Sequence, residues 1–396
     1  MVAIMRFDLI ARRALPRWRH LGLMLAVVLA VTGTPTAAVA AVPLVSATPA
    51  SAVAFDGLVY ASAYVGSTVY VGGSFRHAVV NGKLVPRKRL AALDARTGRL
   101  LPWAPETNGT VMALTAAGSS LYVSGKFTTV AGKPRAGLAG INLRTGAVGA
   151  LRHTVKGVGY ALAAGGGRLF LGGTFKAVDG RPARNLAAFW LSDGALTRFG
   201  SGTDGQVKAL TVAGSRLYVG GGFRRLNGAN GTARLAALRL TDGRVDTGFR
   251  PNAPYLAFAL TVTRDRVYAG LGGPGGRVAA YRPNGSRVWS TVTDGDVQAI
   301  TYLNGAVYAG GHFTVACPQS SRTATSWCPV NLRSQPKLVA LDSANGRLLR
   351  WNPRSNGRWG VLTLDANAAL DTVAVGGEFT AFGGRSRPHF ALFRSR

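Results

Sequence analysis

A short strand-like segment recurs along the chain and constrains its fold more than any other feature. It reads VYVGGSF at 69–75, and the other copies are LYVSGKF (121–127), LFLGGTF (169–175), LYVGGGF (217–223), VYAGLGG (267–273), VYAGGHF (307–313) and VAVGGEF (373–379). Successive copies begin 52, 48, 48, 50, 40 and 66 residues apart. Because repeats of about 40 to 50 residues are typical of propeller blades, the chain is expected to repeat one supersecondary unit.

Each copy lies inside a larger unit, which the fourth copy illustrates. The segment QVKALTVAG (206–214) precedes it, LAALR (235–239) follows it, and the turn Asp242-Gly243 leads to a shorter segment that ends at Phe249-Arg250-Pro251. Short runs rich in Val, Leu and aromatic residues, bounded by Gly, Asn and Asp, are typical of strands. Asp-Gly supplies the positive φ angles of tight hairpins, and the Gly pairs leave room where neighbouring sheets approach closely. The pattern predicts four antiparallel strands in each unit.

Seven such units predict an all-β fold, a seven-bladed β-propeller of four-stranded blades. The last unit stops at Arg396, just after its third strand, while ATPASAVAFDG (47–57) resembles the fourth-strand stretch LPWAPETNG (101–109). We therefore expect an N-terminal strand to complete the last blade, which would remove exposed sheet edges. The expected domain boundaries are 41–56 for a linker and closing strand and 57–396 for the propeller.

Residues 1–40 have the three-part layout of a secretory signal peptide. Arginines precede a short apolar run at 21–31, and Ala38-Val39-Ala40 offers the small residues that a signal peptidase reads. The run is shorter than the roughly 20 residues needed to span a bilayer, so no membrane span is expected after cleavage. An uncleaved anchor is the alternative, and Arg12-Arg13 leaves a twin-arginine export route open. The protein is expected to be secreted or extracellular, with association to the cell envelope as one option.

The chain has two cysteines, Cys317 and Cys328. An even number of cysteines in an exported protein predicts a disulfide. The residues between them provide too few ligands for a metal site.

One of the units resembles a known family of repeats. In LYVGGGF and LAALRLTDGRVDTGFRPNAP (235–254), the residues Arg239, Leu240, Asp242, Gly243, Asp246 and Phe249 fit the delta-60 repeat of secreted bacterial β-propellers. This resemblance implies the fold and an extracellular setting, and it implies no activity. A weaker similarity links 90–103 and 338–351 to the repeats of quinoprotein-type propellers. The chain lacks the adjacent cysteine pair of quinoprotein dehydrogenases, and no cofactor is expected.

Residues suited to catalysis are scarce. Glu106 and Glu378 are the only glutamates, and the histidines beyond the leader fall in different units without ligand-like spacing. Asp294-Gly295-Asp296 lacks the further acidic positions of a calcium loop, so it is expected to form a turn. The sequence therefore predicts no catalytic residues and no metal site.

Basic residues form the one pattern that points to a partner. The chain has 47 Lys and Arg against 16 Asp and Glu, which suggests either an anionic partner or an arginine-rich proteome. Cations gather in the loops between the second and third strands, which are expected to emerge on one face. The candidate binding residues, called the outer cations below, are Arg76, Arg87, Lys88, Arg89, Lys133, Arg135, Arg181, Arg184, Arg224, Arg225, Arg333 and Arg385.

These observations predict a non-catalytic binding or scaffold protein. Its expected partner is an anionic polysaccharide, an anionic cell-wall polymer or another protein, and a monomer is expected. Nucleic acid is not expected, because export separates the protein from DNA and no recognition module is present. The alternative is a carbohydrate-active or quinone-dependent enzyme with its site at a mouth of the propeller channel. Because propellers host both kinds of protein, the fold does not decide between them.

Overall fold

The computed structural model describes residues 41–200, 202–321, 328 and 330–395. The chain divides into a unit of residues 1–41 and a unit of residues 42–396, and the second unit is the one described below. The expected signal peptide, 1–40, lies outside the described residues. The described part of the chain consists of strands, turns and bends, and it contains no apolar helix of membrane-spanning length.

Most of the strands belong to small antiparallel sheets that repeat one pattern. The first strands are β2 (Val59–Val65), β7 (Val111–Ala117), β12 (Val155–Gly165), β16 (Val207–Ala213), β19 (Ala257–Val262), β23 (Val297–Leu303) and β28 (Val361–Asn367). Each pairs with a second strand, namely β3 (Thr68–Gly73), β8 (Ser120–Gly125), β13 (Arg168–Val178), β17 (Arg216–Gly221), β20 (Val267–Leu271), β24 (Ala306–Gly311) and β29 (Thr372–Gly377). The third strands are β6 (Leu90–Asp94), β11 (Leu138–Asn142), β15 (Leu186–Trp190), β18 (Leu235–Arg239), β21 (Gly276–Tyr281), β27 (Leu338–Asp342) and β32 (Phe390–Arg394).

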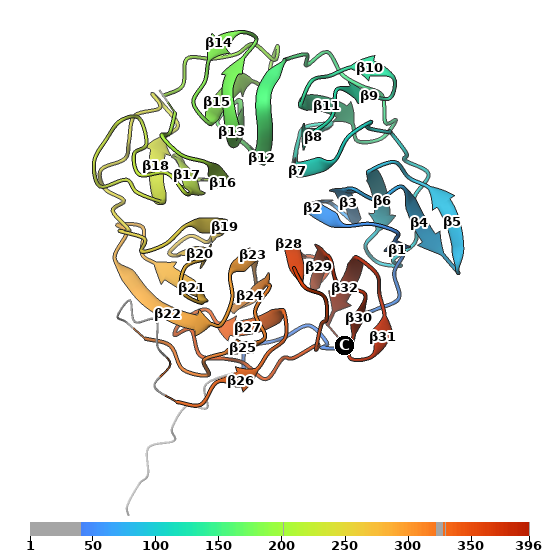
Figure 1. Ribbon diagram of the computed structural model, residues 1–396, viewed down its shortest axis with the longest axis vertical. Coiled ribbons are helices and arrows are strands. Elements are labelled where there is room, and N and C mark those ends of the chain that lie inside the picture. Colours follow the sequence, from blue (N-terminus) through green and yellow to red (C-terminus); the bar gives the residue numbers. More distant parts are fainter. Residues whose placement is uncertain (1–40, 201, 322–327, 329, 396) are drawn as a thin grey trace, which may run out of the picture. The chain divides into compact units, whose positions relative to one another are not determined.

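The sheets follow one another around a common centre, with their first strands innermost (Figure 1). Each first strand contacts the first strand of the next sheet, and β28 contacts β2 in the same way. Apolar side chains from two neighbouring sheets pack between them. Between the last and first sheets, for example, Phe390 and Leu392 lie in one buried cluster with Val59 and Val69. The hydrophobic core is therefore divided into layers that alternate with the sheets.

The Gly pairs of the second strands explain how closely the sheets approach. A Cβ atom on Gly72 would lie 2.6 Å from Cγ1 of Val111 in the next sheet, and one on Gly376 would lie 2.5 Å from Cγ1 of Val59. A Cβ atom on Gly73 would lie 2.0 Å from the backbone oxygen of Leu58, opposite a register shift in the first strand. The first Gly thus admits the neighbouring sheet and the second admits a bulge.

The prediction of four regular strands in every unit was wrong. The sheet of β19, β20 and β21 has such a fourth strand, β22 (Arg287–Thr293), whereas in five other sheets the fourth segment forms a single bridge, such as Leu93↔Leu100. The aromatic residue of this segment contacts the next sheet even where the strand is regular, since Trp289 of β22 donates from Nε1 to the backbone oxygen of Ser343 at 3.0 Å. Trp103 packs edge-on against Tyr70 and donates from Nε1 to the backbone oxygen of Asn142. The turn before this segment was predicted correctly, since Gly243 has a φ of 70°.

The loops between the second and third strands form small hairpins at the outer edge of the sheets (Figure 1). Their strands are β4 (His77–Val80), β5 (Lys83–Pro86), β9 (Thr129–Val130), β10 (Lys133–Pro134), β14 (Arg181–Pro182), β25 (Val315–Ala316), β26 (Arg333–Ser334), β30 (Ala381–Phe382) and β31 (Arg385–Ser386). These hairpins pair with the segment that precedes their own sheet. β4 pairs with β1 (Ala54–Phe55), β25 pairs with β22, and Thr107↔Val130 is the equivalent bridge. The hairpins therefore tie neighbouring sheets together.

The segment before β1 lies along the last sheet without forming a regular strand. The amides of Ser46 and Ala50 donate to the backbone oxygens of Arg394 and Leu392 at 2.8 Å each. The corresponding bond of the first sheet joins the amide of Leu101 to the oxygen of Ala92 at 2.9 Å. Ala50 thus occupies the backbone position that Leu101 has in the fourth segment of its unit.

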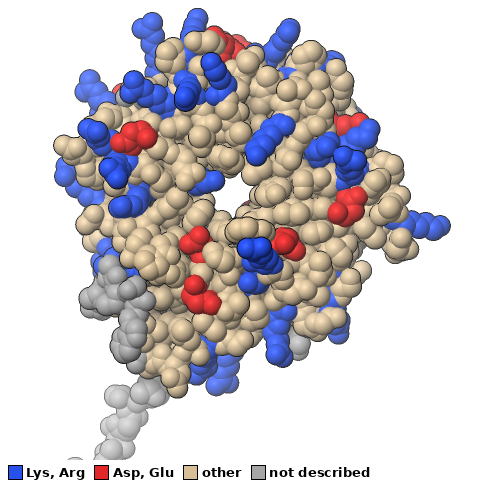
Figure 2. Space-filling view, in the orientation of Figure 1, with Lys and Arg blue, Asp and Glu red and all other residues tan. Residues whose placement is uncertain are grey.

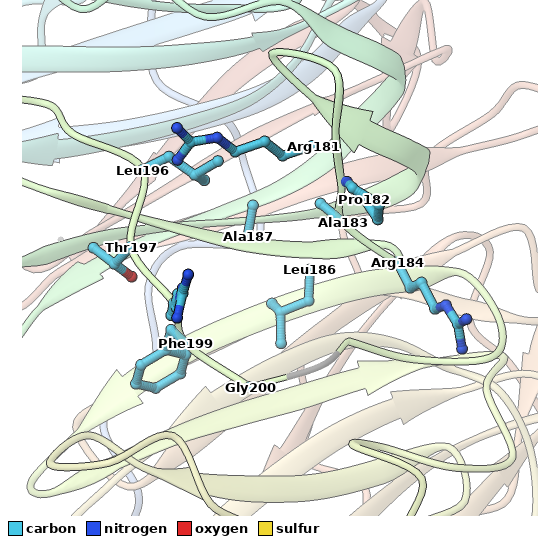
Figure 3. A pocket seen from close by; sticks show the side chains of 11 residues that line it. Arg181, Pro182, Ala183, Arg184, Leu186, Ala187, Leu196, Thr197, Phe199 and Gly200 are labelled. Carbon is cyan, nitrogen blue, oxygen red and sulfur yellow. The ribbon is translucent and has the colours of Figure 1, made fainter.

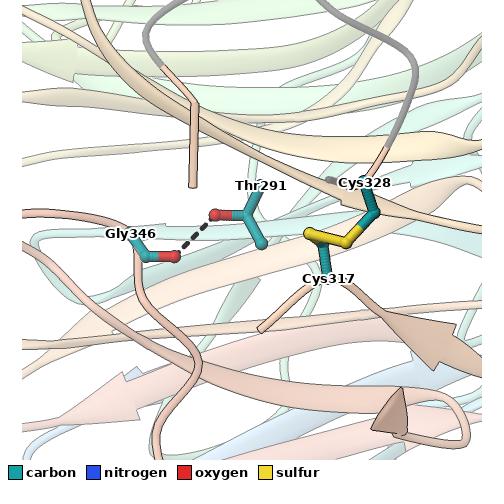
Figure 4. The surroundings of a disulfide bond; sticks show 4 residues. All are labelled: Thr291, Cys317, Cys328 and Gly346. Carbon is teal, nitrogen blue, oxygen red and sulfur yellow. Dashed lines mark hydrogen bonds between the residues drawn. A yellow bond between two sulfur atoms is a disulfide. The ribbon is translucent and has the colours of Figure 1, made fainter. Parts of the chain in front are cut away.

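The predicted disulfide between Cys317 and Cys328 is present (Figure 4). It lies beside Thr291 of β22, whose Oγ1 donates to the backbone oxygen of Gly346 at 2.6 Å. The amide of Cys317 also donates to the oxygen of Val292 at 2.9 Å. The disulfide therefore links Cys328 to a residue that is hydrogen-bonded to the edge of the preceding sheet.

Candidate binding sites on the hairpins and in the channel

The structure places most of the outer cations on the surface of the hairpins. Arg87 and Arg89 are half-buried and Arg135 is 9% exposed. The exposed members are Arg76, Lys88, Lys133, Arg181, Arg184, Arg224, Arg225, Arg333 and Arg385. Lys88 pairs with Glu106 at 2.8 Å and Arg225 pairs with Asp204 at 3.6 Å. The face in Figure 2 carries cations toward its outer part, with a few acidic residues among them.

Several acidic side chains near these cations stabilise the hairpins. Oδ1 of Asp294 accepts the amides of Thr314 and Val315 at 2.7 and 2.9 Å, and Asp294 and Gly295 form a bend where a turn was expected. Oδ1 of Asp204 accepts the amides of Arg224 and Arg225 in the same way, at 2.8 Å each. Burial opposes ionisation of Asp294, but its hydrogen bonds outweigh this effect and lower its pKa. An Asx-Gly pair that was not singled out from the sequence precedes five of the first strands, as Asp56-Gly57, Asn108-Gly109, Asp204-Gly205, Asp294-Gly295 and Asn356-Gly357.

Two of the outer cations, Arg135 and Arg87, form the same pair of hydrogen bonds to backbone oxygens. Arg135 donates from Nη1 to the oxygen of Pro134 and from Nη2 to the oxygen of Gly149, at 2.7 Å each. Arg87 donates to the oxygens of Pro86 and Leu101 at 2.7 and 2.9 Å. Each guanidinium thus joins a hairpin to the fourth segment of the same unit. The guanidinium N–H groups in these hydrogen bonds are therefore not free to donate to the ligand that the sequence predicts.

An arginine that joins a hairpin to the fourth segment in this way is called a clamp below. The last unit also has a clamp, and its partner is the N-terminal segment. Arg387 donates from Nη1 to the oxygen of Ser386 at 2.8 Å and from Nε to the oxygen of Ala50 at 3.3 Å. Ala50 therefore receives the contact that Leu101 receives from Arg87 and Gly149 receives from Arg135.

In the third unit the position of the clamp arginine is taken by Ala183, and a cavity of about 640 Å³ lies there. Figure 3 shows Ala187 and Leu186 at its base, on β15, and Arg181 reaching across from the hairpin toward Leu196. The lining also includes Pro182, Arg184, Thr197, Arg198, Phe199 and Gly200. Arg181 and Arg184 were among the predicted binding residues, whereas Arg198 was not, because it lies on the fourth segment. An alignment of the repeats at Arg87, Arg135 and Ala183 would have shown that the third unit lacks the clamp arginine.

A second hollow, of about 190 Å³, lies at the centre of the sheets, where an opening is visible in Figure 2. Three consecutive residues of each first strand line it. One ring consists of Tyr60, Met112, Tyr160, Lys208, Phe258, Gln298 and Leu362, and the next ring of Ala61, Ala113, Ala161, Ala209, Ala259, Ala299 and Thr363. Nζ of Lys208 lies 3.9 Å from the centre of the Tyr160 ring, and burial lowers the pKa of Lys208.

A small polar group lies near Gln298 of this channel. Gln298 Nε2 is 3.4 Å from His312 Nδ1, and the Trp359 ring lies 6.3 Å from the His312 ring. Burial raises the pKa of Asp296, against the lowering effects of His312 and the Gly273 amide. Among the described residues no group of three or more His, Cys, Asp or Glu side chains could hold a metal ion. Asp296, Gln298 and His312 belong to the sixth unit, and Trp359 precedes the first strand of the seventh.

Comparisons with known proteins identify the fold class and no family. No family model matches the sequence, and none of the curated proteins matches it. The WD40 β-propeller domain of Doa1 is similar with a TM-score of 0.56 and 13% identity, over 89% of this chain and 97% of that one. The computationally designed protein Ika8 is similar with a TM-score of 0.51 and 15% identity, over 86% of this chain and 98% of that one. At these identities the likeness shows the fold alone, and the chain is a β-propeller.

Proposed function

We propose that this chain is an exported, seven-bladed β-propeller that acts as a non-catalytic binding module for an anionic polymer outside the cell. Residues 46–50 complete its last blade, and its repeats are of the delta-60 type. The cyclic contacts of the first strands support the blade count, and the hydrogen bonds of Ser46, Ala50 and Arg387 support the completed blade. The disulfide and the arginine-rich leader at 1–40 support export.

The observation that carries the binding function is the set of exposed outer cations without acidic partners. Lys133, Arg333 and Arg385 lie on hairpins of different units and form no side-chain hydrogen bond or ion pair within the described residues. Cations on several hairpins match a polymer that carries repeated negative charges. Such binding would be sensitive to salt, because the Debye length falls to about 8 Å at physiological ionic strength.

The test compares two charge-matched variants on a column of immobilised acidic polysaccharide. The first variant, Lys133→Gln/Arg333→Gln/Arg385→Gln, removes hairpin cations. The control is Arg96→Gln/Arg144→Gln/Arg347→Gln, which removes three exposed cations from the turns at the opposite ends of the sheets. We expect the hairpin variant to elute at a lower salt concentration than both the control and the wild type. Equal elution of the two variants would overturn the proposed role of the hairpins.

A second candidate function, catalysis at the channel mouth, is favoured by the contact of Gln298 with His312 beside Asp296. A carboxyl group of raised pKa near an imidazole is suited to proton transfer. The lining of the channel itself includes no carboxylate among the described residues, so the group lies beside the channel. Reducing-end release from acidic and neutral polysaccharides, compared between wild type and Asp296→Asn, tests this function. Release that the substitution abolishes would favour catalysis over simple binding.

A further inference from the structure

We infer that the cavity of the third unit is a specific site for an acidic sugar unit, and that Ala183 opens it. The cavity lies between the hairpin that contains β14 and residues 196–200 of the fourth segment. This inference rests on the proposed function, because it names the single sugar unit of the anionic polymer that this cavity binds.

The two walls of the cavity have the same backbone positions as in the units that carry a clamp. The amide of Ala183 donates to the oxygen of Lys176 at 2.9 Å, as the amide of Arg135 donates to the oxygen of Thr128 at 2.8 Å. On the opposite wall the amide of Thr197 donates to the oxygen of Ala188 at 2.8 Å. Gly149 and Gly140 form the equivalent bond of the second unit, also at 2.8 Å.

The difference between the units therefore lies in one side chain. In the first, second and last units an arginine spans the gap and donates to carbonyl oxygens on both walls. In the third unit a methyl group replaces that arginine. The oxygens of Pro182 and Thr197 stand at the positions that accept the guanidinium elsewhere. They are acceptors suited to the hydroxyl groups of a ligand.

The charges at the cavity favour an acidic ligand. Arg181, Arg184 and Arg198 are exposed, and none of the described lining residues is acidic. Asp179 interacts electrostatically with Arg181, but its carboxylate accepts the amide of Thr154 at 2.7 Å and contacts His153 at 2.6 Å. The guanidinium groups remain able to form bidentate contacts with a carboxylate.

The size and the apolar part of the lining favour a sugar over a small inorganic anion. About 640 Å³ lies within the range of roughly 300 to 1,000 Å³ that is typical of small-molecule sites. Leu186, Ala187 and Leu196 give the base an apolar surface on which the carbon face of a sugar ring can pack. A ring that carries hydroxyls and a carboxylate uses the base, the backbone oxygens and the arginines together.

The experiment measures binding of a uronic-acid trisaccharide to the mature protein by isothermal titration calorimetry. A neutral trisaccharide of the same linkage and inorganic phosphate serve as comparison probes. We expect saturable binding of the acidic trisaccharide to one site, and at least tenfold weaker binding of the neutral trisaccharide and of phosphate. Equal binding of the acidic trisaccharide and phosphate would overturn the sugar assignment.

The decisive variant is Ala183→Arg, which restores the clamp of the first, second and last units. It adds a positive charge, so general attraction of anions should increase, whereas a ligand that needs the cavity should bind at least tenfold more weakly. Its control is Ser192→Arg, which adds the same charge at an exposed turn of the same unit and should leave the affinity within twofold. Unchanged or tighter binding to Ala183→Arg would overturn the inference.

A second variant keeps the inference testable if Ala183→Arg fails to fold. Arg181→Gln/Arg198→Gln changes exposed side chains and should weaken trisaccharide binding at least tenfold without lowering the Tm. The polymer column separates this inference from the proposed function. Retention of the wild type on the polymer without trisaccharide binding would overturn the specific site alone, and absence of both would overturn the two together.

Discussion

Asp365 makes the contact between the last and first sheets dependent on pH. It lies on β28, and its carboxylate accepts the amides of Tyr64 on β2 and of Ala366 at 3.0 and 2.9 Å. Other polar contacts join the same two sheets, including Ser62 Oγ to Thr363 Oγ1 at 3.1 Å. Burial raises the pKa of Asp365 to about 6, even though both amide hydrogen bonds act to lower it.

The direction of the effect follows from the two pKa values. The pKa is about 6 in the folded protein and 3.8 is the ordinary value, so the folded state favours the protonated carboxyl. The protonated carboxyl of Asp365 contributes to the stability of the fold below pH 4, and this contribution is lost as the pH rises through 6. A difference of about two units, at ~1.4 kcal/mol each, makes the folded protein less stable at pH 7.5 by about 3 kcal/mol at most.

The substitution Asp365→Asn removes this penalty while keeping the shape of the side chain. It gives up one of the two amide hydrogen bonds, which costs about 1 kcal/mol. We therefore expect the variant to be more stable than the wild type by about 1 to 2 kcal/mol at pH 7.5. At pH 4.5 the advantage should shrink by about 2 kcal/mol, because the wild-type carboxyl is then protonated in the folded state.

Urea unfolding followed by tryptophan fluorescence at pH 7.5 and 4.5 measures both differences. The control is Asp265→Asn, which neutralises a carboxylate whose side chain is 76% exposed. This control should change stability by the same small amount at both pH values. A loss of stability in Asp365→Asn that is equal at pH 7.5 and 4.5 would refute the reasoning.

Three further variants test the packing of the sheets and the loops. Gly376→Ala places a methyl group 2.5 Å from Val59 Cγ1, so calorimetry should show a loss of about 1 to 3 kcal/mol; an unchanged Tm would contradict the close approach. Replacing Cys317 and Cys328 by Ser should cost about 3 kcal/mol in the loop-entropy model, and reductant should lower the Tm of the wild type but not of the variant. Arg135→Met removes two hydrogen bonds from charged donors and should cost about 2 to 4 kcal/mol in urea unfolding; a loss below 0.5 kcal/mol would show that the clamp is dispensable.

The sequence predicted the repeated part of the fold because the same physical requirement recurs at the same position. A side chain at Gly72 would strike the next sheet, so Gly recurs there in most units. The turn at Asp242-Gly243 was predictable for a similar reason, since its positive φ angle favours Gly. The disulfide followed from there being two cysteines.

The candidate sites were less predictable because they depend on contacts between units. Arg87 and Arg135 looked like ligand-binding residues in a basic loop, and only the positions of Leu101 and Gly149 reveal that they hold the loop in place. The fourth segments also have strand-like residues, but in most units their pairing is limited to a single bridge, which their composition does not reveal.

The hydrogen bonds of Ser46 and Ala50 to the last strand have a consequence for the rate of folding. They join residues that are more than 340 positions apart, so they raise the contact order of the domain. Contacts of this kind form late, because the entropy of closing the intervening chain is lost before the contact is gained. The edge of β32 therefore stays uncovered until the rest of the chain has collapsed, and this edge is where an incompletely folded molecule is most open to proteases and to pairing with another copy.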